Sequence, residues 1–522
     1  MSFKLTYATM FDPPEALHTA FEAALARVKS GLGATHAMFI DGKDHLTGRT
    51  RAKSSPIDRD LVLGEFAVGD ATDAALALEA ARRAFPAWRA TPWQERCALL
   101  RRVGEIVEAR VNDIAAAVAL EVGKNRMEAL GEIKEVADFC TVYADDMERN
   151  DGYIRVLPDD PMPGWRSRNR SVMKPYGAWL VIAPYNFPFA LAGGPVSAAL
   201  VAGNTVVLKG ASETQWAGWL LAECLRDAGV PPGVFNYVMG PGATLGQALL
   251  DQPATAGATF TGSHETGMHL IRSFAAGQYP RPVIAEMGGK NAVIVTRHAD
   301  LERATLGIAR SAFGLSGQKC SAASRVYVEA PVAGELKELL AQQIGKLAVG
   351  DPTLRANWMG PVATVDAYRG FAAYNEGFRK RGARVLAGGE HLTRDGLDRG
   401  LFCAPTLVEA AQGDPLWRHE MFLPIAMLGA VESKEEALAR ANDSELGLTA
   451  GFYGDADESR WFFDNVEAGV TYANRPQGAT TGAWPGYQPF GGWKGSGNTG
   501  KAIASFYYLP QYMREQSQTI VE

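Results

Sequence analysis

The sequence predicts an α/β protein built on parallel sheets with helices on both faces. From Gly177 onward, short β-prone runs alternate with helical segments, which is typical of strand–helix–strand units. A second series of the same kind runs from about Asn291 to Asn474. The 522 residues exceed what one hydrophobic core organises, so two or three domains are expected.

Strands and helices can be placed along most of the chain. The predicted strands are GAWLVIAP, TVVLKG, VFNYVMG and GATFTG in the first series, and NAVIVT, SRVYVE, ARVLAGG, FCAPTLVE and IAMLGAV in the second. Residues 14–30 and 71–148 have helical periodicity, and Asp70 or Thr72 is the N-cap of the latter region. Between them, HAMFIDGKDHLTG predicts two strands joined by a turn at Asp41. The tail FYYLPQYMREQSQTIVE is β-prone and requires a partner surface.

The composition argues against several classes of protein. A net charge of −6 gives no reason to expect nucleic acid or anionic membranes as partners. The five scattered cysteines form no CxxC pair and the eight histidines have no HExxH spacing, so neither a disulfide framework nor a metal site is indicated. The apolar windows are too short to span a bilayer, and the first residues lack the apolar run of a signal peptide. We therefore expect a cytoplasmic protein.

One cysteine, Cys320, lies in the loop GLSGQKCSAAS directly before a β-run. The glycines and small residues around it let the backbone come close to a ligand, which suits a nucleophile. Free cysteine also packs as a small hydrophobe, so a filler role is the alternative. A nucleophile requires a base, an oxyanion donor and a pocket, and the rest of the chain offers candidates for each.

Three of these candidates follow predicted strands. Asn186 of APYNFPF either donates its amide to a developing oxyanion or forms an Asx-turn. Lys209 ends the next strand, where it either reaches ribose hydroxyls or a phosphate, or is simply solvated. Gly262 and Ser263 of FTGSHETG either begin a helix whose N-terminus holds a pyrophosphate or form a plain turn.

Glu286 supplies the candidate base, because it ends the apolar run VIAE immediately before two glycines. A carboxylate in apolar surroundings has a raised pKa and can act as a general base near neutral pH. A salt-bridged glutamate at a strand end is the alternative. Together with Cys320, Glu286 makes a site that can activate water against a thioester.

Taken in order, these segments resemble those of a known family. PYNFP, GNTVVLK, FTGS, EMGGKN, GQKCSAASRVYV, HEMFLPI and QPFGG follow one another as in the aldehyde dehydrogenase superfamily. The similarity runs from about Asp41 to Ser517. Within the superfamily, the helix before FIDGKDHLTG, the form GQKCSAASR and the segment GYQPFGGWKGSG are most similar to the L-glutamate γ-semialdehyde (1-pyrroline-5-carboxylate) dehydrogenases.

The resemblance implies an aldehyde-dehydrogenase-like α/β fold. It has a Rossmann-type dinucleotide-binding domain preceded by N-terminal helices, an α/β catalytic domain, a small β oligomerisation flap, and a substrate anchor loop with its return segment. In that order, the expected ranges are 1–149 with 175–290, 291–474, 150–174 with 503–522, and 475–502. The flap implies a homo-oligomer, a dimer or higher.

The resemblance also implies a mechanism. Cys320 attacks the carbon of a small-molecule aldehyde, and Asn186 with the backbone N–H of Cys320 holds the oxyanion of the thiohemiacetal. Hydride transfer to NAD leaves a thioester on the cysteine. Glu286 then activates the water that releases the acid.

The cofactor contacts follow in the same way. Glu420 and Phe422 of HEMFLPI match the contacts to the nicotinamide ribose, Lys209 the contact to the adenosine ribose, and Ser263 the contact to the pyrophosphate. Ser212 stands where many strictly NAD-using relatives have a glutamate that repels a 2′-phosphate. We therefore expect NAD as the cofactor, with some tolerance of NADP.

The substrate implied by the subfamily is L-glutamate γ-semialdehyde, whose α-carboxylate lies away from the reacting carbon. In the subfamily that carboxylate meets a hydroxyl beside the nucleophile and the backbone amides of a glycine-containing loop, a nest that binds anions. The matching residues are Ser321, Gly482 and Ala483, with Phe187 and Phe490 flanking the aliphatic chain. Trp484 and Pro485 replace the smaller aliphatic residues usual in this loop, which would narrow or reshape the pocket.

Other functions remain open at this point. A dehydrogenase for another aldehyde, such as succinic semialdehyde, would differ in the anchor loop from Thr481 to Gly486. A CoA-acylating relative is disfavoured because Glu286 supplies the base that hydrolysis requires. A cofactor-free thiol esterase using Cys320 is the alternative from a different class.

Overall fold

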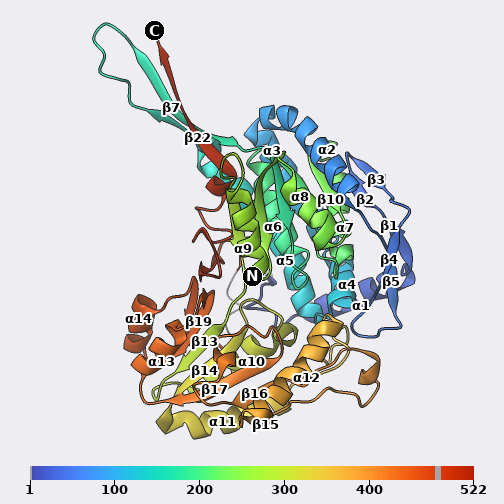
Figure 1. Cartoon of the computed structure of the whole chain (residues 1–522), viewed down its shortest axis with the longest axis vertical. Coiled ribbons are helices and arrows are strands. Elements are labelled where there is room, and N and C mark those ends of the chain that lie inside the picture. The colour runs from blue at the N-terminus through green and yellow to red at the C-terminus, as the bar shows by residue number, and fades with distance from the viewer. Residues whose placement is uncertain (1–2, 477–483) are drawn as a thin grey trace.

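The computed structural model describes residues 3–476 and 484–522 and contains two seven-stranded sheets (Figure 1). The first has the order β12-β11-β8-β9-β10-β2-β3. Its strands are Val283–Glu286, Thr255–Thr261, Ala178–Ile182, Thr205–Lys209, Phe235–Val238, Met38–Ile40 and Lys43–His45. The five strands from β12 to β10 are parallel, as the sequence predicts, and the hairpin of β2 and β3 adds an antiparallel edge.

Helices pack around the first sheet in two groups. Helices α6 and α7 pack with α3, α4 and α5, whereas α2 packs with α8, which in turn contacts α9. These helices are α2 (Ala71–Ala90), α3 (Trp93–Ala109), α4 (Val111–Val122), α5 (Arg126–Arg149), α6 (Ala190–Val201), α7 (Gln215–Asp227), α8 (Gln247–Asp251) and α9 (His264–Ala275). The helical character predicted for residues 71–148 is confirmed. Asp70 is the N-cap of α2, since its side chain accepts from Thr72 and Asp73 completes a capping box.

The second sheet has the order β15-β16-β17-β14-β13-β19-β20. Its strands are Arg384–Ala387, Thr406–Glu409, Ile425–Val431, Ala323–Glu329, Asn291–Val295, Thr449–Tyr453 and Val470–Ala473, and its helices are α10 (Leu301–Phe313), α11 (Ala330–Gly345), α12 (Val365–Lys380), α13 (Lys434–Asn442) and α14 (Ala456–Asn465). All pairings are parallel except that of β15 with β16. Strands β19 and β20 were not predicted: β19 is buried at every position and lacks the alternation of a half-buried strand, and β20 has only four residues.

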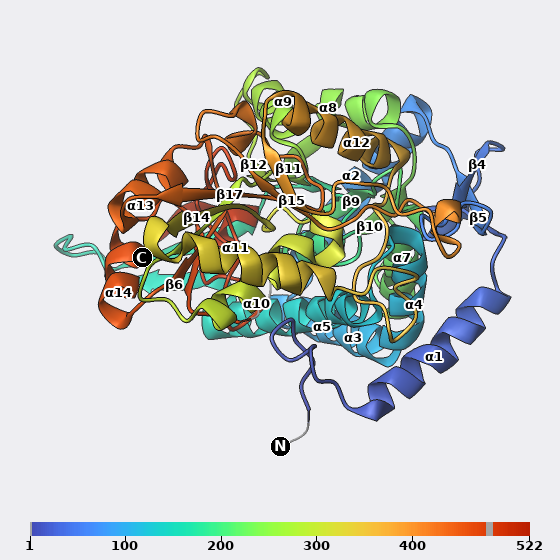
Figure 2. The same cartoon turned by 90° about the horizontal axis from the view of Figure 1, so that it is seen from below.

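The β-prone tail finds its partner in a small third sheet, which projects from the body of the protein (Figure 1). Strand β22 (Met513–Val521) pairs antiparallel with β7 (Ser167–Pro175), and β7 pairs with β6 (Ile154–Leu157). A further sheet of β1 (Ala34–His36), β5 (Val62–Ala67) and β4 (Thr50–Ser54) lies beyond the first large sheet (Figure 2).

The N-terminal helix α1 (Glu15–Ser30) begins one residue after Pro14, close to its predicted start. It packs against α4. No helix in the described residues is long and apolar enough to cross a lipid bilayer.

Candidate active site

The parallel pairing of the first sheet brings three candidate residues, Asn186, Lys209 and Glu286, to one edge of the sheet. Ile182, which precedes the Asn186 loop, pairs with Lys209 of β9 and with Phe260 of β11. In the same register, Thr261 pairs with Glu286 at the end of β12. Because ligands bind outside the carboxyl ends of parallel strands, this edge is the expected position of a binding site.

The cysteine loop lies between α10 and β14 and has an unusual backbone. Leu315, Ser316 and Gly317 all have positive φ angles, of 48°, 53° and 68°. A side chain at Gly317 would collide with the backbone carbonyl of Leu423, so only glycine fits there. Two non-glycine residues in the left-handed region carry strain of about 1–3 kcal/mol each, which the surrounding contacts must offset.

Asn291 and Gly289 fix the backbone of this loop from the second sheet. The Asn291 amide donates to the carbonyl oxygens of Cys320 at 2.7 Å and Ala322 at 2.9 Å, and its oxygen accepts from the backbone of Thr449 at 2.9 Å. A Cβ atom at Gly289 would lie far inside van der Waals contact with the Cys320 carbonyl. The EMGGKN segment therefore packs directly against the nucleophile's own peptide unit.

Gly288 has a matching role for Glu420. The Glu420 carboxylate occupies the space that a Cβ atom at Gly288 would fill, and it accepts a hydrogen bond of 2.9 Å from the Gly289 N–H. Burial raises the pKa of Glu420 to about 7, against the opposing effects of that N–H and of Lys290. The two glycines thus bring this carboxylate and the cysteine loop to the same short backbone segment.

Asn186 is 4 % exposed, and its side-chain N–H donates to the carbonyl of Gln318, two residues before Cys320, at 2.9 Å. An amide nitrogen carries two hydrogens, so one orients the side chain on the cysteine loop and the second is available to an oxyanion. The backbone N–H groups of Ser321 and Cys320 both act on the thiol to lower its pKa. Donors from the Asn186 loop and the cysteine loop therefore converge around Cys320.

The thiol of Cys320 is partly exposed and lies in an acidic environment. Burial, and then the nearby Glu420 and Glu286 carboxylates, raise its pKa to about 12 against the opposing effect of the two backbone N–H groups. The other four cysteines are buried. The neutral thiol is thus the resting form at physiological pH.

Glu286 has the raised pKa that the sequence analysis predicted for a carboxylate in apolar surroundings. Burial raises this pKa to about 8, against the opposing effect of a hydrogen bond of 3.2 Å from the Gly492 N–H. No salt bridge to Glu286 is found in the described part of the chain, so the salt-bridge alternative is not supported. A carboxylate of this kind takes up a proton readily near neutral pH.

Two buried ion pairs, whose carboxylates belong to α5, hold the Asn186 loop and the cysteine loop in place. Lys124 contacts Glu132 at 2.5 Å, and Glu132 also accepts from the backbone of Phe189 at 2.8 Å, which closes the Asn186 loop. Lys319, next to the nucleophile, contacts Glu128 at 2.5 Å, and Glu128 accepts a backbone N–H at the start of the cysteine loop. All four charged side chains are almost fully buried, so loss of one partner leaves an unpaired charge at a cost of about 3–5 kcal/mol.

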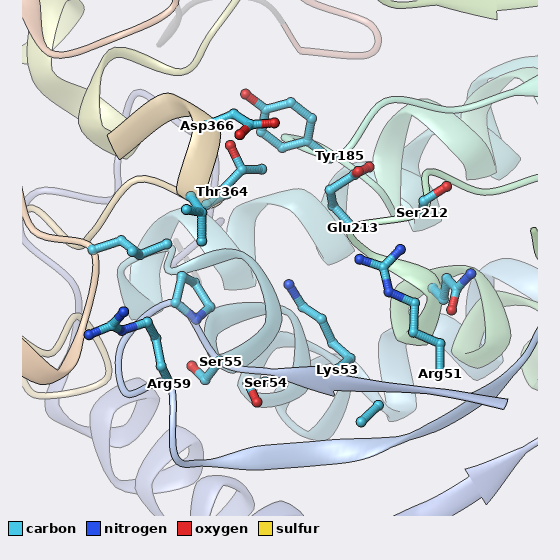
Figure 3. Close-up of a pocket in the computed structure, with 16 residues that line it drawn as sticks. Arg51, Lys53, Ser54, Ser55, Arg59, Tyr185, Ser212, Glu213, Thr364 and Asp366 are labelled. Carbon is cyan, nitrogen blue, oxygen red and sulfur yellow. The ribbon is translucent and has the colours of Figure 1, made fainter. Parts of the chain in front are cut away.

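A cavity lies between the loop that carries Tyr185, the residues that follow β9, and β4 (Figure 3). Tyr185 lines it and packs edge-on against the ring of Phe422 at 5.9 Å, and Ser212 and Glu213 line its other part. The cavity has a volume of about 700 Å³ and also receives Arg51 and Lys53 from β4. Of the predicted cofactor residues, Ser212 lines this cavity, and Phe422 adjoins it through Tyr185.

These groups fit a dinucleotide. Lys209 is 7 % exposed at the end of β9 and can present its ammonium to ribose hydroxyls, and Glu420 offers a carboxylate to the second ribose. Gly262 leads from β11 into α9, where Ser263 is the N-cap and accepts from the Thr266 N–H at 3.3 Å. The N-terminus of a twelve-residue helix suits a pyrophosphate.

The predicted aldehyde-binding residues are only partly described. Ser321 and Phe187 are buried beside the cysteine and Asn186 loops, and Phe490 is half-buried, with its backbone bonded to Ile503. Gly482 and Ala483 lie outside the described residues. Trp484 is 3 % exposed, and its indole N–H donates to Asp138 of α5 at 2.6 Å, so the side chain of Trp484 is fixed against that helix.

Several functional contacts were missed by the sequence analysis. The clamp by Asn291, the Gly492 N–H on Glu286 and the packing of Tyr185 on Phe422 all join residues far apart in the chain. Each of these residues belongs to a quoted motif, but the motifs do not indicate which residues pair with which.

With this geometry the family can be stated. The aldehyde dehydrogenase family matches residues 45–517, and the chain belongs to that family. The protein is therefore an oxidoreductase, and the thiol esterase alternative falls.

The chain is similar along its whole length to several 1-pyrroline-5-carboxylate dehydrogenases. The chain is 36% identical over 522 residues to a 1-pyrroline-5-carboxylate dehydrogenase of Geobacillus sp. (strain WCH70), and 37% identical over 519 residues to 1-pyrroline-5-carboxylate dehydrogenase 1 of Halalkalibacterium halodurans; each match covers 97% of both chains. Among solved structures, the 1-pyrroline-5-carboxylate dehydrogenase from Thermus with bound NAD has a TM-score of 0.92 at 31% identity and covers 100% of this chain and 99% of its own.

The two glycines provide the first prediction. Gly289→Ala should lower kcat/KM at least about 100-fold, because the new methyl group displaces the Cys320 carbonyl and so shifts the residue that carries both the thiol and an oxyanion donor. Gly288→Ala should chiefly raise the KM for the dinucleotide, because it displaces the Glu420 carboxylate. Steady-state kinetics with both substrates measures the two effects.

Gly334→Ala is the matched control, since a Cβ atom there has open space on α11. It should leave both kinetic constants unchanged. Wild-type kcat/KM in Gly289→Ala would contradict the proposed packing of EMGGKN against the nucleophile.

Proposed function

We propose that the protein oxidises L-glutamate γ-semialdehyde to L-glutamate with NAD⁺ in the cytoplasm, as a step of proline catabolism. The observation that carries the proposal is that Asn186 and Glu286 both lie close to the cysteine loop. The similarity of the chain along its full length to 1-pyrroline-5-carboxylate dehydrogenases supports the choice of substrate. 1-Pyrroline-5-carboxylate and the semialdehyde interconvert by ring opening with water. The open aldehyde is the form that a thiol can attack.

The reaction begins with attack of the Cys320 sulfur on the aldehyde carbon, after the thiol has lost its proton. The Asn186 amide and the Cys320 backbone N–H donate to the resulting oxyanion, and one such donor contributes about 10²–10³ in rate. When bound, NAD⁺ would accept the hydride, and its positive charge would favour the thiolate of Cys320, whose charged neighbours in this chain are the carboxylates of Glu420 and Glu286. Loss of the hydride leaves a thioester on Cys320.

Glu286 completes the cycle as general base. It takes a proton from a water molecule that attacks the thioester carbonyl, the carbon–sulfur bond breaks, and the acid leaves while the thiol is restored. Because burial raises the pKa of Glu286 to about 8, its ionised fraction grows as pH rises to that value. Deacylation should accelerate over the same range.

Substrate selection is assigned to the groups around the aldehyde. Ser321, with Gly482 and Ala483, would bind the α-carboxylate, and Phe187 and Phe490 would enclose the aliphatic chain. The burial of Ser321 next to the nucleophile supports this assignment. Succinic semialdehyde, which lacks the amine-bearing α-carbon and is therefore one carbon shorter, is the nearest competing substrate.

The substrate proposal predicts a measurable preference. kcat/KM for glutamate γ-semialdehyde should exceed the values for succinic semialdehyde and propanal by about tenfold or more, which corresponds to about 1.4 kcal/mol in transition-state binding. NADH formation with purified enzyme measures it, and Cys320→Ala should be inactive with all three. Equal or reversed values would leave the cysteine chemistry in place and refute the substrate.

The cofactor is assigned as NAD⁺ with some acceptance of NADP⁺. Ser212 places no negative charge where a 2′-phosphate would lie, and Arg51 and Lys53 line the same cavity, although Glu213 opposes them (Figure 3). Repeating the assay with NADP⁺ tests this, since Ser212→Glu should reduce the NADP⁺ rate and spare the NAD⁺ rate. Equal loss with both nucleotides would contradict the assignment.

A homo-oligomer completes the proposal. The small sheet of β6, β7 and β22 projects from the body and exposes Val156 (87 %), Ile520 (56 %) and Val521 (47 %), which suits burial against a second copy. Light scattering should give a mass at least twice the 56.1 kDa of one chain, and Val156→Asp should lower it. A monomeric wild-type protein would refute this part.

A further inference from the structure

The segment before α1 contacts Phe187 and Trp484, two residues beside the proposed aldehyde site that we call the aldehyde wall. We define residues Lys4–Phe11 as the N-terminal strap; it precedes the region matched by the family, which begins at residue 45. Figure 2 shows the chain before α1 running beside α5 and α10. Leu5, Tyr7 and Met10 of the strap are buried in the same core cluster as Phe187 and Trp484.

Tyr7 is the central contact of the strap. Its ring meets Phe187 edge-on at 6.3 Å and Trp484 edge-on at 5.1 Å, so it stands between two residues of the aldehyde wall. Its hydroxyl donates to Glu135 of α5 at 2.7 Å. Phe187 is held from another side by the Lys124 ammonium, 3.3 Å from its ring centre.

Helix α5 leaves space for the Tyr7 ring at Gly131. A Cβ atom at Gly131 would lie 2.9 Å from the Tyr7 ring, so the glycine leaves the space that Tyr7 fills. Glycine inside a helix costs about 1 kcal/mol relative to alanine, a cost that the packing of Tyr7 offsets. The strap and α5 are thus complementary at this position.

Charged contacts fix the rest of the strap to the same wall. Lys4 pairs with Asp138 at 3.1 Å, the carboxylate that also accepts the Trp484 indole N–H. The Lys4 ammonium lies 5.2 Å from the ring centre of Tyr487. Lys4 is half-exposed, so the ion pair itself contributes little, and its role is to orient Asp138 toward Trp484.

The far end of the strap is linked through Arg310 to the residues that lead into the anchor loop. Phe11 packs under the Arg310 guanidinium at 3.7 Å, and Arg310 donates to the carbonyl of Pro476 at 3.4 Å. The strap therefore contacts Phe187, Trp484 and Tyr487 directly and is linked to Pro476 through Arg310.

We propose that the N-terminal strap is a positioning element for aldehyde specificity, in which Tyr7 sets the placement of Phe187 and Trp484. This inference rests on the proposed function insofar as Phe187 is taken to line the aldehyde site. It predicts that disturbing the strap impairs recognition of an extended aldehyde much more than that of a small one, and leaves dinucleotide binding intact.

The test compares Tyr7 variants of the full-length enzyme. Tyr7→Ala should raise the KM for the aldehyde that the wild type prefers by about tenfold, with a much smaller change for propanal and none in the KM for NAD⁺. Tyr7→Phe keeps the ring contacts and loses only the hydrogen bond to Glu135, so it should stay within about threefold of wild type. Steady-state kinetics with each aldehyde gives the readout.

Phe21→Ala is the control for loss of a buried N-terminal aromatic, because Phe21 is fully buried on α1 and faces Arg126. It should lower the melting temperature without changing the ratio of the aldehyde KM values. The same unchanged ratio in Tyr7→Ala would overturn the proposal and leave the strap a stabilising role only. Should Tyr7→Ala fail to fold, Tyr7→Leu is compared instead, with the same ratio deciding.

The experiment separates this inference from the substrate assignment. A wild-type enzyme that prefers another aldehyde refutes glutamate γ-semialdehyde, yet the strap is still tested with that aldehyde against propanal. A wild-type preference for glutamate γ-semialdehyde with an unchanged ratio in the Tyr7 variant refutes the strap alone.

Discussion

The close approach of Gly288 and Gly289 to their neighbours is the constraint on which the rest of the site depends. One glycine leaves room for the Glu420 carboxylate and the other for the Cys320 carbonyl. These residues belong to the short link between β12 of the first sheet and β13 of the second. A few consecutive residues thus carry the candidate base, two close approaches and the Asn291 clamp, so the two sheets cannot shift relative to each other without moving the nucleophile.

Buried charge gives this arrangement its rigidity. Helix α5 presents Glu128 and Glu132, each paired with a buried lysine, and each carboxylate also accepts backbone N–H groups from an active-site loop. Such pairs contribute little net stability compared with apolar packing, but they fix one geometry, because any other leaves a charge unpaired in the interior. This network holds the strained cysteine loop. Tyr7 binds the same helix through Glu135 and contacts the aldehyde wall with its ring.

Much of the fold and the centre of the site could be predicted from the sequence. Apolar runs alternating with helices predict parallel sheets, and parallel strands bring Lys209 and Glu286 to one edge wherever the strands end. Contacts such as Gly492 with Glu286, or Tyr7 with Trp484, could not be predicted, because they join residues hundreds of positions apart and leave no periodic signal. Strand β19 was missed for a related reason: burial at every position removes the alternation that marks a strand.

The division of labour between Cys320 and Glu286 is the central claim, and single-turnover kinetics of Glu286→Gln tests it most directly. Mixing this variant with NAD⁺ and aldehyde above pH 8 should give a burst of about one NADH per subunit and then stall. The peptide containing Cys320 should carry the mass of the thioester. Steady turnover close to the wild-type rate, with no acylated cysteine, would contradict the account.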